Sequence, residues 1–387
     1  MALSSELLTA SDAPVVCRRI ETANGLGLGH AELSVAATLN SLSLPMIDLL
    51  RPQLAAWLDD PTIAAVVITG AGDKAFCAGG DIQALYHSIR ENQAAGAIVN
   101  RYPFEFFERE YRLDYELHTA TKPIVVLGHG IVMGGGFGIL GGGRFRVVTD
   151  TVRLAFPEVT IGLFPDAGGT WLFRNMPSHL ALFLGATGAS INAADAIAAT
   201  AATHCIPDAL RPQFLPELAA LAWTEDAEAN GQLIESWLGT VAVEPAVPRE
   251  SDAIPAGLAK AGDVHSLVAS IRALAGTSRW IDKGIATLDA GCPTTVGIVY
   301  EQLRRAPSLN LAECFRLEMT VASHCAVNAD FAEGVRALLI DKDGKPAWQH
   351  ASLAELPHAH VLAHFDAPTG AEAFWDANPL QDLGAHR

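Results

Sequence analysis

The stretch that decides the fold spans residues 122–138 and reads KPIVVLGHGIVMGGGFG. Its first half contains the apolar, β-branched run 124–127 between proline and glycine, which is typical of a buried strand. Its second half is a glycine-rich turn in which a short helix can begin. Residues 124–140 are about long enough to span a membrane, but His129 and the glycines at 134–136 interrupt them. A buried strand that leads into a tight turn therefore explains the stretch better.

Strands and helices alternate on both sides of this stretch. The pattern predicts a hairpin from residues 15–21 and 27–33, and short buried strands at 64–69, 144–148 and 154–156. Apolar residues recur at helical spacing over residues 43–58, and residues 82–120 are expected to be largely helical. Alternating strands and helices indicate an α/β fold.

The character of the sequence changes near residue 206. Residues 206–330 have helical periodicity and almost no β-branched runs. We therefore predict a core over residues 14–205 and a mainly helical C-terminal region over residues 206–387. The proline- and acid-rich stretch 241–255 is the expected flexible connection.

Composition limits the possible partners and locations. The chain has 387 residues, half of them apolar, so it can bury a large core. Its net charge of −17 argues against a nucleic-acid or membrane surface, although a local basic pocket for an anionic ligand remains compatible. The N-terminal residues lack a secretory pattern, and Glu6 and Asp12 disfavour a transit peptide. Six scattered cysteines are expected to be reduced thiols, so we predict a cytoplasmic protein.

Several catalytic and metal-binding patterns do not fit. The motifs G-x-S-x-G and G-x-x-x-x-G-K-[ST] do not occur in the sequence. Residues 136–141 match G-x-G-x-x-G, but the next strand begins near Arg144, too early for the helix that a dinucleotide site needs. His358, His360 and His364 match no known zinc pattern and are expected to lie in a solvated tail.

Two glycine loops each follow a predicted strand: FCAGGD at 76–81 and MGGGFG at 133–138. The simpler interpretation is that glycine serves tight turns and close packing. Alternatively, the loops expose two backbone N–H groups that converge on one oxygen, and a helix starting in the second loop would favour an anion there. Two such donors would form an oxyanion hole. Neither loop decides the question alone.

The segment 156–169, FPEVTIGLFPDAGG, carries two carboxylates in an apolar loop, Glu158 and Asp166. They could cap the turns or helices that follow. Carboxylates beside apolar walls are also suited to acid–base or nucleophilic chemistry. The local sequence leaves both interpretations open.

Together, KAFCAGGDI (74–82), KPIVVLGHGIVMGGGFG (122–138) and PEVTIGLFPDAGG (157–169) resemble the crotonase, or enoyl-CoA hydratase/isomerase, superfamily. Within it the chain most resembles the 3-hydroxyisobutyryl-CoA hydrolase group, through FFEREY at 106–111, the aspartate after Phe164–Pro165, and DFAEGVRALLIDKDGKPAW at 330–348. The resemblance implies a crotonase-like spiral of ββα units with two near-perpendicular sheets, followed by helices.

The resemblance also implies site residues: oxyanion-hole N–H groups at Gly80 and Gly135, an acid pair at Glu158 and Asp166, a substrate-binding acid at Glu110 and a CoA contact at Ala78. Lys74 is a candidate for a second CoA contact, in place of the basic residue that many relatives use, and its alternative is an ordinary solvated loop lysine. One departure concerns the CoA phosphates. Many relatives carry a basic residue before the first long helix, whereas LSVAATLN at 33–40 contains neither arginine nor lysine.

The residues also bear on the reaction. Hydratases of this superfamily carry a second catalytic glutamate three residues beyond the oxyanion-hole glycine, where this chain has Gly138. Asp166 stands where many hydratases have glycine. Hydration of an enoyl-CoA would therefore lack half its catalytic groups, and the resemblance favours hydrolysis of a thioester.

The resulting hypothesis is an acyl-CoA thioester hydrolase that acts on 3-hydroxyisobutyryl-CoA in valine catabolism. It needs no metal and no cofactor, since coenzyme A is part of the substrate, and it has no nucleic-acid or membrane partner. The resemblance is compatible with a homo-oligomer, either trimer or hexamer, or with a monomer. The alternatives are a hydratase or isomerase on the same fold and a catalytically silent CoA-binding relative.

Overall fold

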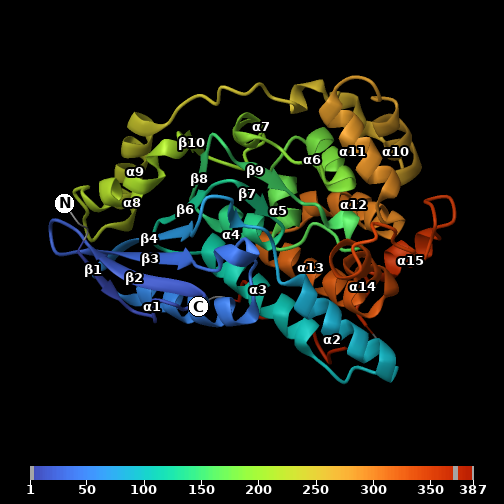
Figure 1. Ribbon diagram of the computed structural model, residues 1–387, viewed down its shortest axis with the longest axis horizontal. Helices are drawn as coiled ribbons and strands as arrows, with labels where there is room; N and C mark the ends of the chain where they lie inside the picture. Colours follow the sequence, from blue (N-terminus) through green and yellow to red (C-terminus); the bar gives the residue numbers. More distant parts are fainter. Residues whose placement is uncertain (1–3, 369–373, 386–387) are drawn as a thin grey trace. The chain divides into compact units, whose positions relative to one another are not determined.

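The computed structural model describes residues 4–368 and 374–385 (Figure 1). The chain divides into two compact units, each built from three separate segments. Unit 1 comprises residues 1–80, 116–154 and 191–249, and unit 2 comprises residues 81–115, 155–190 and 250–387. Residue 206 lies within unit 1, and the division of the chain into a core and a C-terminal region stays a prediction.

Unit 1 is organised around a seven-stranded sheet. In spatial order its strands are β1 (Ser5–Leu7), β2 (Val15–Glu21), β3 (Gly27–Leu33), β4 (Ile63–Gly70), β6 (Ile124–Gly128), β8 (Phe145–Thr149) and β10 (His204–Ile206). The predicted hairpin is confirmed, because β2 and β3 pair antiparallel over their whole length. From β3 onward all neighbours are parallel. The apolar runs IAAVVITG and IVVLG form β4 and β6, as expected for strands covered on both faces.

Helices pack against both faces of this sheet. Strand β3 shows this, because successive side chains of a strand point to opposite faces. Leu28 belongs to a hydrophobic cluster with Phe214 of α8 (Arg211–Ala219) and Leu238 of α9 (Ala227–Val241). Gly29 faces the other way, where Trp57 of α1 (Leu44–Asp59) packs so closely that a Cβ at position 29 would lie 2.5 Å from the indole. The remaining helices of unit 1 are α4 (Gly135–Gly142) and α7 (Ala193–Ala198).

A second, three-stranded sheet has the order β5 (Ala75–Cys77), β7 (Ile131–Met133) and β9 (Arg153–Ala155). Strands β5 and β7 are parallel, with Ala75 opposite Ile131 and Cys77 opposite Val132. The loops that follow these strands therefore leave the sheet at the same edge. The predicted α/β class with two sheets and a helical C-terminal region is confirmed.

Unit 2 is mainly helical. Its helices are α2 (Ile82–Ala95), most of α3 (Tyr102–His118), α5 (Gly169–Arg174), α6 (Ser178–Thr187), α10 (Val264–Arg272), α11 (Arg279–Ala290), α12 (Pro293–Arg305), α13 (Leu311–Val327), α14 (Ala329–Val335) and α15 (His358–Ala363). Helices α6 and α12 pack closely, since a Cβ on Gly185 would lie 2.7 Å from Val299. Helix α13 contacts α2, α5 and α14, so it lies at the centre of the unit.

The prediction that residues 82–120 are largely helical is confirmed. Residues 82–120 form two helices, because α2 ends at Gly96, whose φ of +61° is a left-handed conformation that suits glycine. Helix α3 begins six residues later, at Tyr102. This break allows α3 to bury a face of its own, which carries the substrate-binding acid implied by the resemblance.

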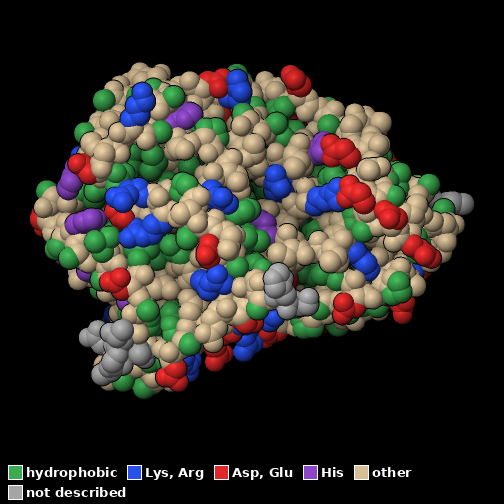
Figure 2. All heavy atoms as spheres, turned by 180° about the vertical axis from the view of Figure 1, so that it is seen from behind, with side chains coloured by type: hydrophobic (Ala, Val, Ile, Leu, Met, Phe, Trp, Pro, Cys, Tyr) green, Lys and Arg blue, Asp and Glu red, His purple; other side chains and the backbone are tan. Residues whose placement is uncertain are grey.

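Among the residues that the structure describes, no helix is both long and apolar enough to cross a membrane. None of the six cysteines forms a disulfide, as the sequence predicts, and all six are buried. On the face drawn in Figure 2, basic and acidic side chains occur side by side among apolar ones.

Candidate active site

Unit 2 brings together the three acids that the sequence singles out. Glu110, Glu158 and Asp166 are 2%, 4% and 4% exposed. Two further buried carboxyl groups belong with them: besides burial, the charge of Glu318 raises the pKa of Glu110, and the charges of Glu110, Glu318 and Asp166 raise the pKa of Asp114. We call these five residues the acid cluster. Since ionised carboxylates are costly to bury without cations, the cluster is an unusual concentration of proton-binding groups.

Helix α3 contributes Glu110 and Asp114. The aromatic residues Phe106, Phe107 and Tyr111 recur at helical spacing and bury one side of the helix. Glu110 and Asp114 are four residues apart and share that buried side. Burial and the charges of Asp166 and Glu318 raise the pKa of Glu110 well above its usual value.

Glu158 begins the 3₁₀ turn Glu158–Thr160, just after β9. Within the described part of the chain, its Oε2 atom has no hydrogen-bond partner. Burial and the charge of Asp166 raise the pKa of Glu158 well above 4.5, although a hydrogen bond from its own backbone N–H lowers it. An acid held in this way is a strong base once it loses its proton.

Asp166 lies in a loop of unusual backbone geometry. The next two residues, Ala167 and Gly168, have φ values of +51° and +82°, and the left-handed conformation is costly for alanine. The Tyr111 hydroxyl donates a 2.6 Å hydrogen bond to Oδ2 of Asp166. Burial raises the pKa of Asp166 to about 7, while the bond from Tyr111 lowers it. Asp166 can therefore gain or lose a proton near neutral pH.

Two side chains from α12 and α13 hold the backbone of this loop. The Glu318 carboxylate accepts hydrogen bonds from the N–H groups of Gly168 (2.8 Å) and Thr170 (2.7 Å). Gln302 donates from Nε2 to the Pro165 carbonyl and to Oγ1 of Thr170, both at 2.7 Å. The conformation around Asp166 is thus fixed from outside the loop.

Sequence reasoning missed Tyr111, Asp114, Gln302 and Glu318. A signal was present for two of them. Asp114 follows Glu110 by four residues on an apolar helix face, and Glu318 interrupts the apolar pattern of α13 between Phe315 and Met319. An acid on the apolar face of a predicted helix indicates either a buried pair or a functional group.

Unit 1 brings the two glycine loops together. A Cβ on Gly136 would lie 2.4 Å from the Cys77 carbonyl oxygen, so glycine is required for this approach. Gly135 is the first residue of α4, and the N–H groups of Phe137 and Gly138 donate to the carbonyl of Gly134. The N–H of Gly135 has no acceptor within its own helix, because it lies in the first turn. Helix α4 thus starts inside the second loop, which is the condition that the oxyanion interpretation sets.

Gly80 lies in the neighbouring loop, next to Leu42, with which it forms an isolated parallel bridge. The Asn40 side chain fixes this region by donating to the carbonyls of Ala71 (2.9 Å) and Ala75 (3.1 Å). The two glycine loops therefore lie side by side, and the roles of Gly80 and Gly135 stay predictions.

The two residues implied to contact CoA also lie in unit 1. Lys74 is exposed immediately before β5. Ala78 is half-buried, and its N–H donates to the Leu39 carbonyl at 3.0 Å. The Ala78 N–H is thus already paired within unit 1. Both CoA contacts stay predictions.

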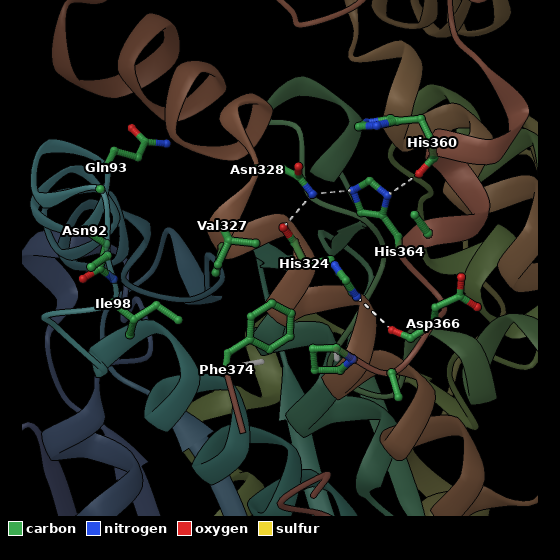
Figure 3. Close-up of a pocket in the computed structure, with 16 residues that line it drawn as sticks. Asn92, Gln93, Ile98, His324, Val327, Asn328, His360, His364, Asp366 and Phe374 are labelled. Atoms are coloured by element: carbon green, nitrogen blue, oxygen red, sulfur yellow. Dashed lines mark hydrogen bonds between the residues drawn. The ribbon is translucent and has the colours of Figure 1, made fainter. Parts of the chain in front are cut away.

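A cavity of about 750 Å³ also lies in unit 2, between the end of α2, the end of α13 and the segment after α15 (Figure 3). In its wall, Asn328 donates from Nδ2 to Nε2 of His364 (3.1 Å), whose Nδ1 donates to the His360 carbonyl (2.9 Å). His364 is buried, so the prediction of a solvated tail is wrong for this residue. Burial lowers its pKa to about 4, as expected for a neutral ring. The described residues include no metal-binding group of three or more His, Cys, Asp or Glu side chains.

The sequence resembles known proteins over most of its length. A family described as enoyl-CoA hydratase/isomerase matches residues 28–365. Similar curated proteins are named 3-hydroxyisobutyryl-CoA hydrolase, mitochondrial. The protein from Gallus gallus is 34% identical over 87% of this chain and 85% of its own length. The protein from Homo sapiens is 33% identical over 84% of this chain and 83% of its own length.

Two solved structures are also similar. One is titled a carnitinyl-CoA dehydratase from Mycobacterium thermoresistibile, with a TM-score of 0.79 and 31% identity over 94% of this chain and 99% of that one. The other is titled an enoyl-CoA hydratase from Rhodobacter sphaeroides, with a TM-score of 0.76 and 29% identity over 91% of this chain and 97% of that one.

Proposed function

The chain belongs to the enoyl-CoA hydratase/isomerase family, and from this premise we propose that it hydrolyses the thioester bond of an acyl-CoA, preferring 3-hydroxyisobutyryl-CoA. The names of the curated relatives support this reaction. The observation that carries the proposal is the burial of Asp166 in one acid cluster with Glu158 and Glu110, with Tyr111 bound to its carboxylate.

The first requirement is stabilisation of charge on the thioester oxygen. In the proposed reaction the N–H groups of Gly80 and Gly135 donate to this oxygen as negative charge develops on it. A single donor of this type typically contributes roughly 3 to 4 kcal/mol to lowering the barrier. The contact between the loops, at Gly136 and Cys77, supports this role because it fixes their separation.

Glu158 is the proposed reacting carboxylate. It either attacks the carbonyl carbon, which expels the CoA thiolate and leaves a mixed anhydride that water then cleaves, or it removes a proton from a water that attacks directly. In both routes one water is consumed, the acyl group leaves as a carboxylic acid, and the CoA sulfur gains a proton. The raised pKa of Glu158 supports either role, since it strengthens the ionised form as a base.

Asp166 and Glu110 have separate proposed roles. Asp166 assists proton transfer or positions the water, and its pKa of about 7 suits a group that exchanges protons near neutral pH. Glu110 binds the hydroxyl of the acyl group. A buried polar group can discriminate strongly here, because a substrate without the hydroxyl leaves it unpaired.

A second candidate function is hydration or dehydration of an enoyl-CoA, which the titles of the two similar solved structures favour. Gly138 opposes it, because this residue stands where hydratases of the superfamily carry their second glutamate. Glycine offers no side chain to hold or activate a water. Hydrolysis is therefore the better-supported reaction.

The test is release of free thiol across a panel of acyl-CoA esters, run beside a spectrophotometric assay of crotonyl-CoA hydration. The proposal expects the highest kcat/KM for 3-hydroxyisobutyryl-CoA in the thiol assay and no hydration. Hydration without thiol release would establish the second function, and binding without either reaction would establish a silent relative.

Pathway, location and assembly are also proposals. The reaction would yield 3-hydroxyisobutyrate and CoA, a step of valine catabolism. A cytoplasmic location remains a prediction, and the vertebrate relatives are named mitochondrial, so fractionation of the source cells is the direct test. Light scattering coupled to gel filtration distinguishes a trimer or hexamer from a monomer.

A further inference from the structure

Glu318 makes contacts that the proposed reaction does not itself explain. It lies in the middle of α13, is fully buried, and spans 150 and 148 sequence positions to reach Gly168 and Thr170. Both of its carboxylate oxygens accept a backbone N–H, Oε2 from Gly168 and Oε1 from Thr170. Only a carboxylate offers two acceptors in this geometry, because an amide replaces one of them with a donor.

The segment that Glu318 holds directly follows Asp166. Ala167 and Gly168 are both left-handed, and a left-handed alanine persists only where its surroundings fix it. Gln302 holds the other end of the segment through the Pro165 carbonyl. Glu318 and Gln302 thus fix the backbone on both sides of Asp166, while Tyr111 fixes its carboxylate.

We propose that Glu318 is a positioning residue for Asp166: by binding the N–H groups of Gly168 and Thr170, it fixes the loop so that the Asp166 carboxylate stays in the place that thioester hydrolysis requires. This inference rests on the proposed role of Asp166 in hydrolysis. It adds to that role a residue distant in sequence, on a helix that contributes no other group to the proposed reaction.

The cost of placing an acid here supports a functional reason. Burial raises the pKa of Glu318 to about 8, and its charge raises the pKa values of Glu110 and Asp114. Helix α5 has only six residues, and ordinary capping uses a small polar side chain next to the helix rather than an acid from another helix. Burying an acid beside other acids therefore costs free energy that capping α5 alone does not require. The same acid immobilises the backbone next to Asp166.

The test uses Glu318→Gln, which keeps the shape but replaces one acceptor with a donor. Misplacing a catalytic group by about 1 Å can cost up to about 100-fold in rate, so we expect kcat to fall by about 10- to 100-fold with KM nearly unchanged. The matched control is Glu301→Gln, which neutralises another buried acid of unit 2 that is paired with Arg305 and does not bind this loop. We expect wild-type kcat for the control.

A double-variant cycle separates positioning from general stability. If Glu318 acts through Asp166, then adding Glu318→Gln to Asp166→Asn should reduce kcat no further. Multiplying effects of the two changes would overturn the inference, as would wild-type kcat in folded Glu318→Gln. Wild-type kcat in Asp166→Asn alone would instead overturn the proposed role of Asp166, so the two failures are distinguishable.

Glu318→Asp provides the same test if the glutamine variant does not fold. It keeps the charge and both acceptors but shortens the side chain by one methylene, which lengthens both bonds to the loop. We expect a reduced kcat and faster amide hydrogen exchange in a peptide that covers residues 163–172, with exchange in the rest of α13 unchanged. Wild-type kcat and unchanged exchange would contradict the positioning role.

Discussion

The hydroxyl of Tyr111 donates a 2.6 Å hydrogen bond to Oδ2 of Asp166, inside unit 2 and across 55 positions of sequence. Both groups are almost inaccessible to solvent. The bond favours the ionised form of Asp166, against the effect of burial. It therefore lowers the pH at which Asp166 changes its protonation state.

Tyr111→Phe removes this bond and keeps the ring. Because the bond lowers the pKa of Asp166, its loss should raise that pKa above about 7. In the plot of kcat/KM against pH, the limb that reports the titration of Asp166 should move to higher pH. The free energy of unfolding of the variant should fall by about 1 to 3 kcal/mol. Tyr300→Phe, which removes a hydroxyl bound to the Ala261 carbonyl, is the control for the limb position. A limb that stays in place or moves to lower pH would contradict the assignment.

Glu158→Gln should reduce thioester hydrolysis by at least about 100-fold, because the amide is neither a base nor a nucleophile. The variant should largely retain its binding of a non-hydrolysable CoA analogue, which calorimetry measures. Single-turnover hydrolysis by the wild type in ¹⁸O-water then separates the routes. Label in the Glu158 carboxylate means an anhydride, and its absence favours activated water. A variant that keeps more than about a tenth of the wild-type rate would exclude Glu158 as the reacting group.

Glu110→Ala should mainly affect the choice of substrate. The ratio of kcat/KM for 3-hydroxyisobutyryl-CoA over isobutyryl-CoA should fall, because the hydroxyl loses its buried partner. The loss of one such hydrogen bond corresponds to about 10-fold or more in this ratio. An unchanged ratio in the folded variant would remove Glu110 from the acyl-binding site.

Gly136→Ala tests the contact between the glycine loops. Its Cβ would lie 2.4 Å from the backbone oxygen of Cys77, so one loop has to move. We expect kcat to fall by about 10-fold or more, as for other small displacements of catalytic groups. The control is Gly239→Ala in α9, where a Cβ has no heavy atom within 4 Å. That variant should stay fully active and gain about 0.5 to 1 kcal/mol of stability. Full activity in Gly136→Ala would show that the loops tolerate displacement.

Asp114→Asn should stabilise the protein increasingly as the pH rises. Burial raises the pKa of folded Asp114 well above 3.8, so above about pH 4 the unfolded chain is ionised at this position while the folded protein keeps its proton. Wild-type stability then falls as pH rises towards the folded pKa, by up to about 1.4 kcal/mol per pH unit, whereas asparagine has no proton to lose.

Urea unfolding at several pH values between about 5 and 8 measures this difference. The exposed Glu225→Gln is the control for the loss of one negative charge. A stability difference between Asp114→Asn and the wild type that stays constant with pH would show that folded Asp114 is ionised over the whole range.

The local sequence pattern was enough to predict the strands and helices and part of the candidate active site. The runs at β4 and β6 are apolar on both faces, and the glycines after β5 and β7 mark the loops, so both could be predicted from short windows. Tyr111 and Glu318 could not be assigned a role in this way, since their partners lie 55 and about 150 positions away. The buried His364 accepts a hydrogen bond from Asn328, which is 36 positions away in the sequence.

The interleaving of the two units along the chain has a consequence for biosynthesis. The nascent polypeptide changes units after residues 80, 115, 154, 190 and 249. A ribosome that has reached residue 249 has supplied all of unit 1, yet Glu110, Glu158 and Asp166 still await the helices α12 and α13 that complete their surroundings. Domains usually fold from the N-terminus during translation, so unit 1 can form first. Catalytic competence is then acquired only late in translation, when the segment that carries Glu318 has left the ribosome.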